Sequence, residues 1–228
     1  MAARAGFAAI RARAEARNGG PAGLAERLPK AKSAAELRAL PDDRYLSLMS
    51  LRIFRAGLKH SLVDARWPAF EEAFHGFSPP RIRAMSDEAI EALLKDARLI
   101  RHLGKLRATH ANAAAFCEIA ARAGKGGGFG AYLADWPGES VVALWDDLAK
   151  RFQQMGGNSG PMFLRMAGKD TFILSQSVVA ALNHWGAFAG EPKGKAARAS
   201  VQAIFNDWAA ETGLPLCHLS MILAQSVE

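Results

Sequence analysis

The stretch "MGGNSGPMFLRMAGKDTF", residues 155–172, stands out in a sequence that is otherwise typical of helices. Glycine or a small polar residue occupies every position from 156 to 160. Pro161 follows, and proline favours the first position of a helix. Asp170 comes one short apolar segment later, where we expect the next helix to begin. The stretch predicts two helices joined by a glycine turn, a hairpin covering about residues 140–168.

Helical periodicity continues on both sides of this hairpin. Tyr45, Leu48, Met49 and Ile53 recur at a spacing that places them on one face of a helix. Ser86 is a favourable first residue for a helix over 86–100. No stretch alternates as a strand would. We therefore predict an all-α fold, a two-lobed helical bundle.

The division of the chain follows from its prolines and its helical pattern. Residues 1–43 read as an N-terminal helical extension with short, proline-broken helices, and residues 44–228 as the main helical domain. The Arg-rich residues 1–20 resemble a mitochondrial transit peptide in composition, but an ordinary basic helix has the same composition. We favour the ordinary helix, because alanine-rich composition persists through the whole chain.

Composition narrows the class of protein. Half of the 228 residues are hydrophobic, yet no apolar run approaches the ~20 residues that a membrane span needs. The two cysteines, Cys117 and Cys217, show no zinc-binding spacing. We expect no metal site, no cofactor and no membrane contact, and a reducing, cytoplasmic location.

The net charge of +7 is concentrated in one half of the sequence. Residues 1–110 hold 20 of the 29 basic residues and 12 of the 22 acidic ones. Such an excess favours a polyanionic partner, of which nucleic acid is the commonest. A basic surface that only keeps the protein soluble explains the same numbers.

The glycine turn has two interpretations. Backbone N–H groups at the start of a helix can hold a phosphate, and glycine lets the phosphate come close. Gly156, Gly157, Asn158, Ser159 and Gly160 would then bind the DNA backbone without reading its sequence. The second interpretation is a plain connection between two helices.

Asp170 also has two interpretations. A carboxylate beside the anomeric carbon of deoxyribose stabilises the positive charge that develops when a base is cleaved from its sugar. The target nucleotide would first have to be flipped out of the duplex. Alternatively, Asp170 caps the helix that we expect to begin there, by accepting hydrogen bonds from Ile173 or a nearby residue.

A second stretch, "LLKDARLIRHLGKLRATHANA" at residues 93–113, gives the chain a family likeness. With the hairpin and Asp170, it resembles the helix–hairpin–helix DNA glycosylase superfamily, and within it the bacterial DNA-3-methyladenine glycosylase I family. The likeness covers about residues 44–182, some three-fifths of the chain. The residues that carry it in this stretch are Ile100, Arg101, His102, Gly104, Lys105 and Asn112.

The resemblance implies a DNA base-excision repair enzyme that flips a damaged, alkylated base and hydrolyses its N-glycosidic bond. Asp170 would be catalytic, with DNA contacts from Lys169, Arg101, His102 and Lys105 besides the glycine turn. The lyase lysine of some superfamily members has no match in "PMFLRMAG", residues 161–168, which implies a monofunctional glycosylase. The implied partner is double-stranded DNA with a damaged base, bound by a monomer at the bacterial nucleoid.

The implied base pocket departs from the family pattern. Arg52 stands where the family has an acidic residue, and His60 stands where it stacks the base on tryptophan. Phe54 or Trp67 is a candidate for the missing stacking wall. Arg52 would repel a cationic methylated purine. Two alternatives therefore stay open: a catalytically silent DNA-binding module of the same fold, and a helical protein-interaction scaffold.

Overall fold

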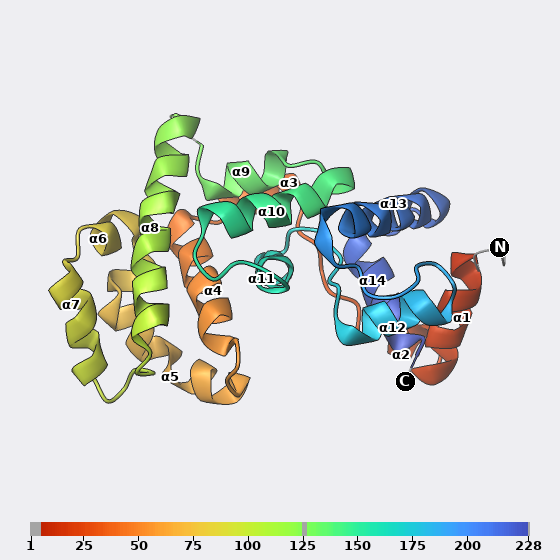
Figure 1. The fold of residues 1–228 in the computed structure, drawn as a ribbon, viewed down its shortest axis with the longest axis horizontal. Helices are drawn as coiled ribbons and strands as arrows, with labels where there is room; N and C mark the ends of the chain where they lie inside the picture. The colour runs from red at the N-terminus through yellow and green to blue at the C-terminus, as the bar shows by residue number, and fades with distance from the viewer. Residues whose placement is uncertain (1–5, 125–126, 228) are drawn as a thin grey trace. The chain divides into compact units, whose positions relative to one another are not determined.

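A computed structural model describes residues 6–124 and 127–227, and every regular element in this part of the chain is a helix (Figure 1). The predicted all-α class is confirmed. The chain divides into two compact units, each formed from segments that are distant in the sequence.

Unit 1 comprises Met1–Ala31, Pro137–Leu144 and Gly168–Glu228, of which residues 1–5 and 228 lie outside the described part. Its helices are α1 (Phe7–Arg17), α2 (Pro21–Ala25), the 3-10 helix η3 (Gly138–Ser140), α12 (Gln176–His184), α13 (Gly194–Thr212) and α14 (Leu216–Gln225).

The N-terminal helix is part of the core of unit 1. The ring of Phe7 lies 5.3 Å from that of Trp208 in α13, and the backbone N–H of Phe7 donates to the Glu211 carboxylate at 3.2 Å. Phe7, Ile10 and Ala14 are fully buried and form one helical face. The predicted extension over residues 1–43 is therefore divided: its first helices pack with the C-terminal helices, and α3 (Ala34–Ala39) belongs to unit 2.

Unit 2 comprises Lys32–Trp136 and Trp145–Ala167. After α3, its helices are α4 (Asp42–Arg55), α5 (His60–Ala73), η1 (His75–Phe77), α6 (Pro79–Arg83), α7 (Asp87–Ala92), η2 (Leu93–Lys95), α8 (Leu103–Ala123), α9 (Phe129–Asp135) and α11 (Ser159–Ala167). Helix α10 (Val141–Arg151) begins in unit 1 and ends in unit 2.

Helix α4 contributes most of its predicted apolar face to the core of unit 2. Tyr45, Met49 and Ile53 are fully buried, while Leu48 is half-buried. The α4 side chain Asp42 also accepts a hydrogen bond from the backbone N–H of Phe129, at 2.8 Å, and so holds the start of α9. The predicted amphipathic helix is confirmed, and its first residue also attaches α4 to α9.

The helix predicted over residues 86–100 is shorter in the structure. Ser86 caps it as expected, because its hydroxyl accepts a hydrogen bond from the N–H of Ala89 at 3.2 Å. The α-helix ends at Ala92, and Asp96 then accepts a hydrogen bond from the backbone N–H of Arg98 at 2.9 Å. An aspartate that binds the backbone two residues ahead favours a turn over a continued helix.

Candidate functional site

The predicted hairpin is present in the structure. Helix α10 ends at Arg151 and α11 begins at Ser159, and Gly157 has a positive φ of 58° in the turn between them. Gly160 approaches the backbone closely, since a Cβ atom there would lie 3.1 Å from the carbonyl oxygen of Met155. The turn therefore needs glycine at these two positions for different reasons.

The exposed part of the turn is shorter than predicted. The N–H groups of Ser159 and Gly160 donate to the carbonyl oxygens of Gly156 and Met155, each at 3.1 Å, and Gly160 is buried. These two N–H groups are engaged within the turn, so they do not fit the predicted role as phosphate donors. Gly156, Gly157 and Asn158 are exposed and stay candidates for that contact.

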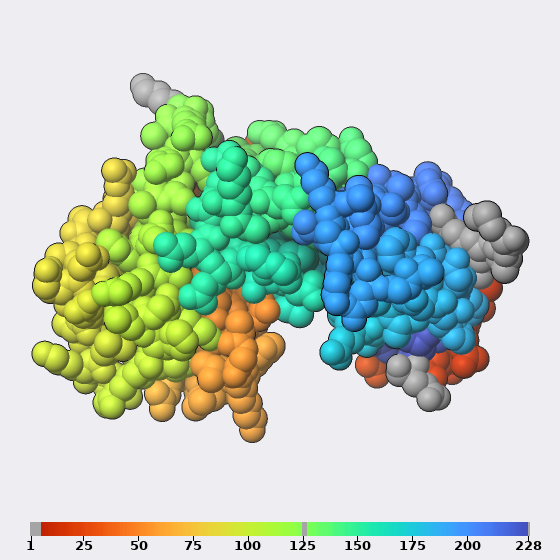
Figure 2. Space-filling view, in the orientation of Figure 1, coloured from red at the N-terminus to blue at the C-terminus, as the bar shows by residue number. Residues whose placement is uncertain are grey.

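Side-chain amides attach the turn to helix α8. Asn112, which is buried in α8, donates to the carbonyl oxygen of Gln153 at 3.2 Å and accepts from the N–H of Gln153 at 2.7 Å. Gln154 donates to the carbonyl oxygen of Gly104 at 3.0 Å. In Figure 2 the two segments, lime and blue-green, adjoin on the visible face of unit 2. Asn112 was one of the residues that carry the family likeness, but the sequence did not indicate these hydrogen-bond partners.

Two predicted DNA-contact residues lie beside this junction. Arg101 and His102 are both exposed. His102 is also the N-cap of α8, because its ring Nδ1 accepts a hydrogen bond from the N–H of Lys105 at 3.3 Å. The Gln154 bond to Gly104 places the hairpin turn next to the start of α8, which these two residues precede. Unit 2 thus brings together the two segments predicted to contact phosphate.

Lys105 has a different role from the predicted DNA contact. Its ammonium donates to the carbonyl oxygens of Phe54 and Ala56, at 3.2 and 2.7 Å, and the residue is 6% exposed. Burial, and secondarily the positive charge of Arg52, lower the pKa of Lys105. The prediction is wrong for this residue, because the end of helix α4 uses its hydrogen-bonding capacity.

One of the four predicted pocket residues belongs to the core, and a second packs against core rings. Phe54 is fully buried, and its ring lies 4.5 Å from that of Phe70. Trp67 stacks on Phe70 at 5.1 Å and on Phe77 at 5.3 Å. The buried Phe54 ring is not available as a free stacking wall, so the prediction is wrong for Phe54. Trp67 is half-buried and stays a candidate.

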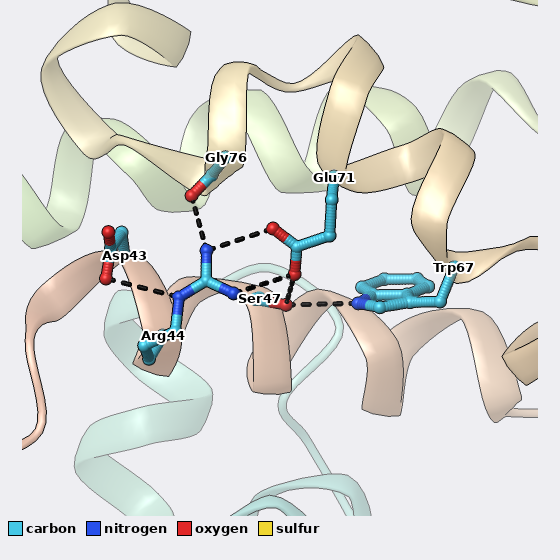
Figure 3. A network of polar contacts seen from close by, with 6 residues as sticks. All are labelled: Asp43, Arg44, Ser47, Trp67, Glu71 and Gly76. Atoms are coloured by element: carbon cyan, nitrogen blue, oxygen red, sulfur yellow. Dashed lines mark hydrogen bonds and ion pairs between the residues drawn. The ribbon is translucent and has the colours of Figure 1, made fainter.

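A polar network fixes Trp67 and joins α4 to α5 (Figure 3). The Trp67 indole N–H donates to the Ser47 hydroxyl at 3.0 Å, and that hydroxyl donates to Glu71 at 2.6 Å. Arg44 donates to both carboxylate oxygens of Glu71, at 3.0 and 2.9 Å, and to the carbonyl oxygen of Gly76 at 2.6 Å. Paired guanidinium and carboxylate groups of this geometry set the register between two helices.

Arg52 and His60 remain candidates for the base pocket. His60 is exposed at the first position of α5. Arg52 is half-buried in α4, and its Nε atom is buried with no hydrogen-bond partner in the described part of the chain. Burial, and secondarily the charge of Arg55, lower the pKa of Arg52. A guanidinium nevertheless keeps its charge at neutral pH.

An apolar groove of about 450 Å³ lies near Arg101 in unit 2. It is lined by Leu58, Leu62, Arg66, Ala97, Leu99, Ile100 and Arg101. Leu62 is 47% exposed, and Arg66 donates to the carbonyl oxygen of Leu99 at 3.1 Å. The lining includes none of the four predicted pocket residues.

Asp170 lies in unit 1, in an extended segment instead of at a helix start. Helix α12 begins at Gln176 and is capped by Ser175. The Asp170 carboxylate accepts hydrogen bonds from the N–H groups of Leu216 at 2.9 Å and Cys217 at 2.8 Å, at the start of α14. The residue caps a helix, as one interpretation proposed, but that helix begins 46 residues later.

The neighbours of Asp170 are buried. Lys169 is 8% exposed, and Thr171 is fully buried. The N–H of Ile173 donates to Ser220 at 3.1 Å, so Asp170 does not cap its own segment. Asp170 itself is half-buried. The burial of Lys169 opposes the phosphate contact that we predicted for it.

The described residues contain no group of three or more His, Cys, Asp or Glu side chains arranged to hold a metal ion. Both cysteines are free thiols. In the same part of the chain, no helix combines the length and apolar character that a membrane span requires.

Comparison with curated proteins finds local similarity. The chain is 37% identical over 65 residues to the DNA-3-methyladenine glycosylase 1 of Escherichia coli K12, which is 28% of this chain and 35% of that protein. It is 39% identical over 65 residues to the DNA-3-methyladenine glycosylase of Haemophilus influenzae. The chain thus matches about a third of the length of these relatives.

Solved structures show a similar fold over a longer part of the chain. The 8-oxoguanine DNA glycosylase of Methanocaldococcus jannaschii aligns with a TM-score of 0.54 and 14% identity, covering 94% of this chain and 91% of that one. The 3-methyladenine DNA glycosylase I of Staphylococcus aureus aligns with a TM-score of 0.50 and 20% identity, covering 70% and 91%. At these identities the likeness concerns the fold.

The sequence profile of the methyladenine glycosylase family matches residues 38–155. That segment is just over half of the chain, and it contains α4, α8 and the first half of the hairpin. Its match agrees with the likeness carried by residues 93–113. The chain belongs to the methyladenine glycosylase family.

Proposed function

We propose that the protein is a monofunctional DNA glycosylase that releases a damaged base from duplex DNA. The family match over residues 38–155 carries this proposal. Relatives named as DNA-3-methyladenine glycosylases support an alkylated base as the first substrate to test. The whole activity is a proposal, because the chain aligns with only part of those relatives.

Asp170 is the proposed catalytic group. Two backbone N–H groups hold its carboxylate, so its orientation is set before a substrate binds. In the reaction the C1′–N bond breaks and its electron pair goes to the base. The carboxylate stabilises the positive charge on the sugar and takes a proton from the attacking water. The water oxygen bonds to C1′. An uncharged base leaves as an anion and takes up one proton, whereas a cationic base leaves neutral and the proton of the attacking water goes to solvent.

The proposed phosphate contacts lie in unit 2. The exposed residues of the turn, Gly156, Gly157 and Asn158, adjoin Arg101 and His102 through the Gln154 bond to Gly104. Backbone N–H groups and cationic side chains bind phosphate without reading the base sequence. Such a surface suits a repair enzyme that has to search any sequence for damage.

Purified protein should convert duplexes with one alkylated, deaminated or oxidised base into duplexes with an abasic site. Asp170→Asn should lower the single-turnover rate about 100-fold or more, the size seen when a charge-stabilising group is removed. Asp207→Asn, which changes an exposed aspartate of α13, is the matched control and should keep the rate. Undiminished activity in Asp170→Asn would exclude the role proposed for that residue.

A catalytically silent DNA-binding module is the second candidate. The burial of Phe54 favours it, because this ring is lost as a stacking wall for a flipped base. It predicts duplex affinity that falls steeply with salt. It also predicts no abasic product across the whole lesion panel, which is the result that separates it from the enzyme.

A further inference from the structure

The side chain of Arg52 carries a hydrogen-bonding group that the protein leaves unused. Its Nε atom is buried, yet no acceptor for it is found among the described residues. Buried donors in folded proteins nearly always have a partner, because an unpaired one costs free energy. The residue as a whole is only half-buried, and its terminal nitrogens have no hydrogen bond among the described residues, so an acceptor carried by a ligand can bind the guanidinium there.

Two other positively charged side chains interact with the Arg52 guanidinium. Arg55 and Lys105 are the two cations that interact with it electrostatically. Arg55 is already paired, since it donates to both oxygens of Asp64 at 2.9 and 2.8 Å. Lys105 donates to the carbonyl oxygens of Phe54 and Ala56, which carry no net charge. No ion pair of Arg52 occurs within the described part of the chain, so its positive charge is uncompensated.

We propose that Arg52 makes the enzyme selective for an uncharged damaged base that presents a carbonyl oxygen, and that it excludes cationic alkylated purines. This inference rests on the proposed function. A guanidinium donates to the carbonyl edge of a base, as arginine does to guanine. A base with a formal positive charge would instead meet a second positive charge, in surroundings that screen it less than water does.

The chemistry of bond cleavage favours the same class. When the C1′–N bond breaks, its electron pair goes to the base. A cationic base becomes neutral at this step and needs no proton. An uncharged base becomes negative until it takes a proton from solvent water. Relative to the free enzyme and substrate, a fixed guanidinium beside the base attracts the negative charge that develops on an uncharged base, whereas it repels a cationic base until the bond has broken.

Two methylated guanines provide a matched test. In duplex DNA, 1-methylguanine is uncharged and 7-methylguanine is cationic, while both carry one methyl group and the same carbonyl oxygen. Duplexes with each base, and with hypoxanthine and uracil, are compared in single-turnover assays after subtraction of spontaneous base loss. We expect at least tenfold faster release of an uncharged base than of 7-methylguanine.

Variants of Arg52 separate its charge from its packing. Arg52→Gln should lower the release of uncharged bases at least tenfold, and Arg52→Glu should reverse the preference in favour of 7-methylguanine. Arg83→Gln removes an exposed charge at the end of α6 and should leave both rates unchanged. Circular dichroism melting of each variant checks that the fold is kept.

Binding is measured in parallel with uncleavable duplexes that carry a 2′-fluorinated sugar. Tighter binding of 1-methylguanine than of 7-methylguanine, lost in Arg52→Gln, supports the inference even if neither is released. Release without this preference, or a preference that Arg52→Gln retains, overturns the inference and leaves the proposed glycosylase intact. Equal binding of both duplexes with no release from any lesion overturns both proposals.

Discussion

The carboxylate of Asp170 binds the backbone N–H of Cys217, 47 residues further along the chain, at 2.8 Å. Its second oxygen accepts a hydrogen bond from the backbone N–H of Leu216, so the side chain caps helix α14. The same group is the proposed catalytic carboxylate. A change at Asp170 therefore affects stability and activity together, and the two effects have to be separated by measurement.

Asp170→Ala should lower the free energy of unfolding by about 1–2 kcal/mol, the usual effect of losing a side-chain helix cap. Asp170→Asn keeps one carbonyl oxygen as an acceptor, so its free energy of unfolding should fall by less. Urea unfolding followed by circular dichroism measures both. An unchanged midpoint in Asp170→Ala would show that the cap does not stabilise the fold in solution.

Lys105→Met should destabilise the protein by about 1–3 kcal/mol, because the carbonyl oxygens of Phe54 and Ala56 lose their donor. The affinity of this variant for undamaged duplex DNA should equal that of the unaltered protein, since the Lys105 side chain is buried. Thermal melting and fluorescence anisotropy test the two halves of the prediction. Weaker DNA binding at unchanged stability would restore the phosphate contact first expected of Lys105.

Arg101→Gln should weaken binding to all duplexes alike and should lower the slope of log affinity against log salt by about 1. The reason is that an exposed arginine next to the hairpin turn would replace one counterion on the DNA. Affinity is measured between about 50 and 200 mM salt. Arg83→Gln is the control, and an equal change in its slope would argue against a localised interface.

Glu71→Gln should lower the free energy of unfolding by about 1–3 kcal/mol, because the half-buried Arg44 loses a charged partner. The neighbouring Glu72→Gln provides the comparison. Its carboxylate is exposed and contacts only the exposed Arg98 among the ion pairs found, so little change is expected. Urea unfolding of both variants checks the prediction, which fails if the two lose the same stability.

The two tyrosines should resist ionisation while the protein is folded. Burial raises the pKa of Tyr45 to about 12, and burial followed by the Asp147 hydrogen bond raises that of Tyr132. Unfolded tyrosine ionises near pH 10. The stability from burying the neutral Tyr45 phenol is thus full below about pH 10 and is lost as pH rises through about 12.

An absorbance titration at 295 nm tests this pH dependence. The folded protein should show no tyrosinate near pH 10, while the protein in denaturant should ionise there. Tyr45→Phe should flatten the loss of stability above pH 10. A native titration midpoint near pH 10 would contradict the burial of both phenols.

Local patterns in the sequence predicted the local structure well. The spacing of Tyr45, Met49 and Ile53 gave the buried face of α4, and Ser86 gave a helix start. The glycines from 156 to 160 gave the hairpin. These features depend on residues within one or two helical turns, so their physical causes lie within the stretch that was read.

The roles of individual side chains depended on distant partners. Lys105 is buried because α4 ends beside it, and Trp67 is held by its hydrogen bond to Ser47 and its stacking on Phe77. Asp170 caps a helix that begins at Leu216. Periodicity places a residue on a helix face but does not give its depth or its partner. The sequence therefore did not show that Phe54, Lys105 and Lys169, all predicted to contact DNA or a base, are buried.

The amide clamp between Asn112 and Gln153 has a consequence for the proposed contact with DNA. One side chain engages both the N–H and the C=O of the same residue, so the loop leading into the hairpin turn is preassembled on α8. A loop that is already rigid loses little conformational freedom when a phosphate docks on it. For the proposed glycosylase, more of the contact energy would then remain to bend the duplex and expose a nucleotide.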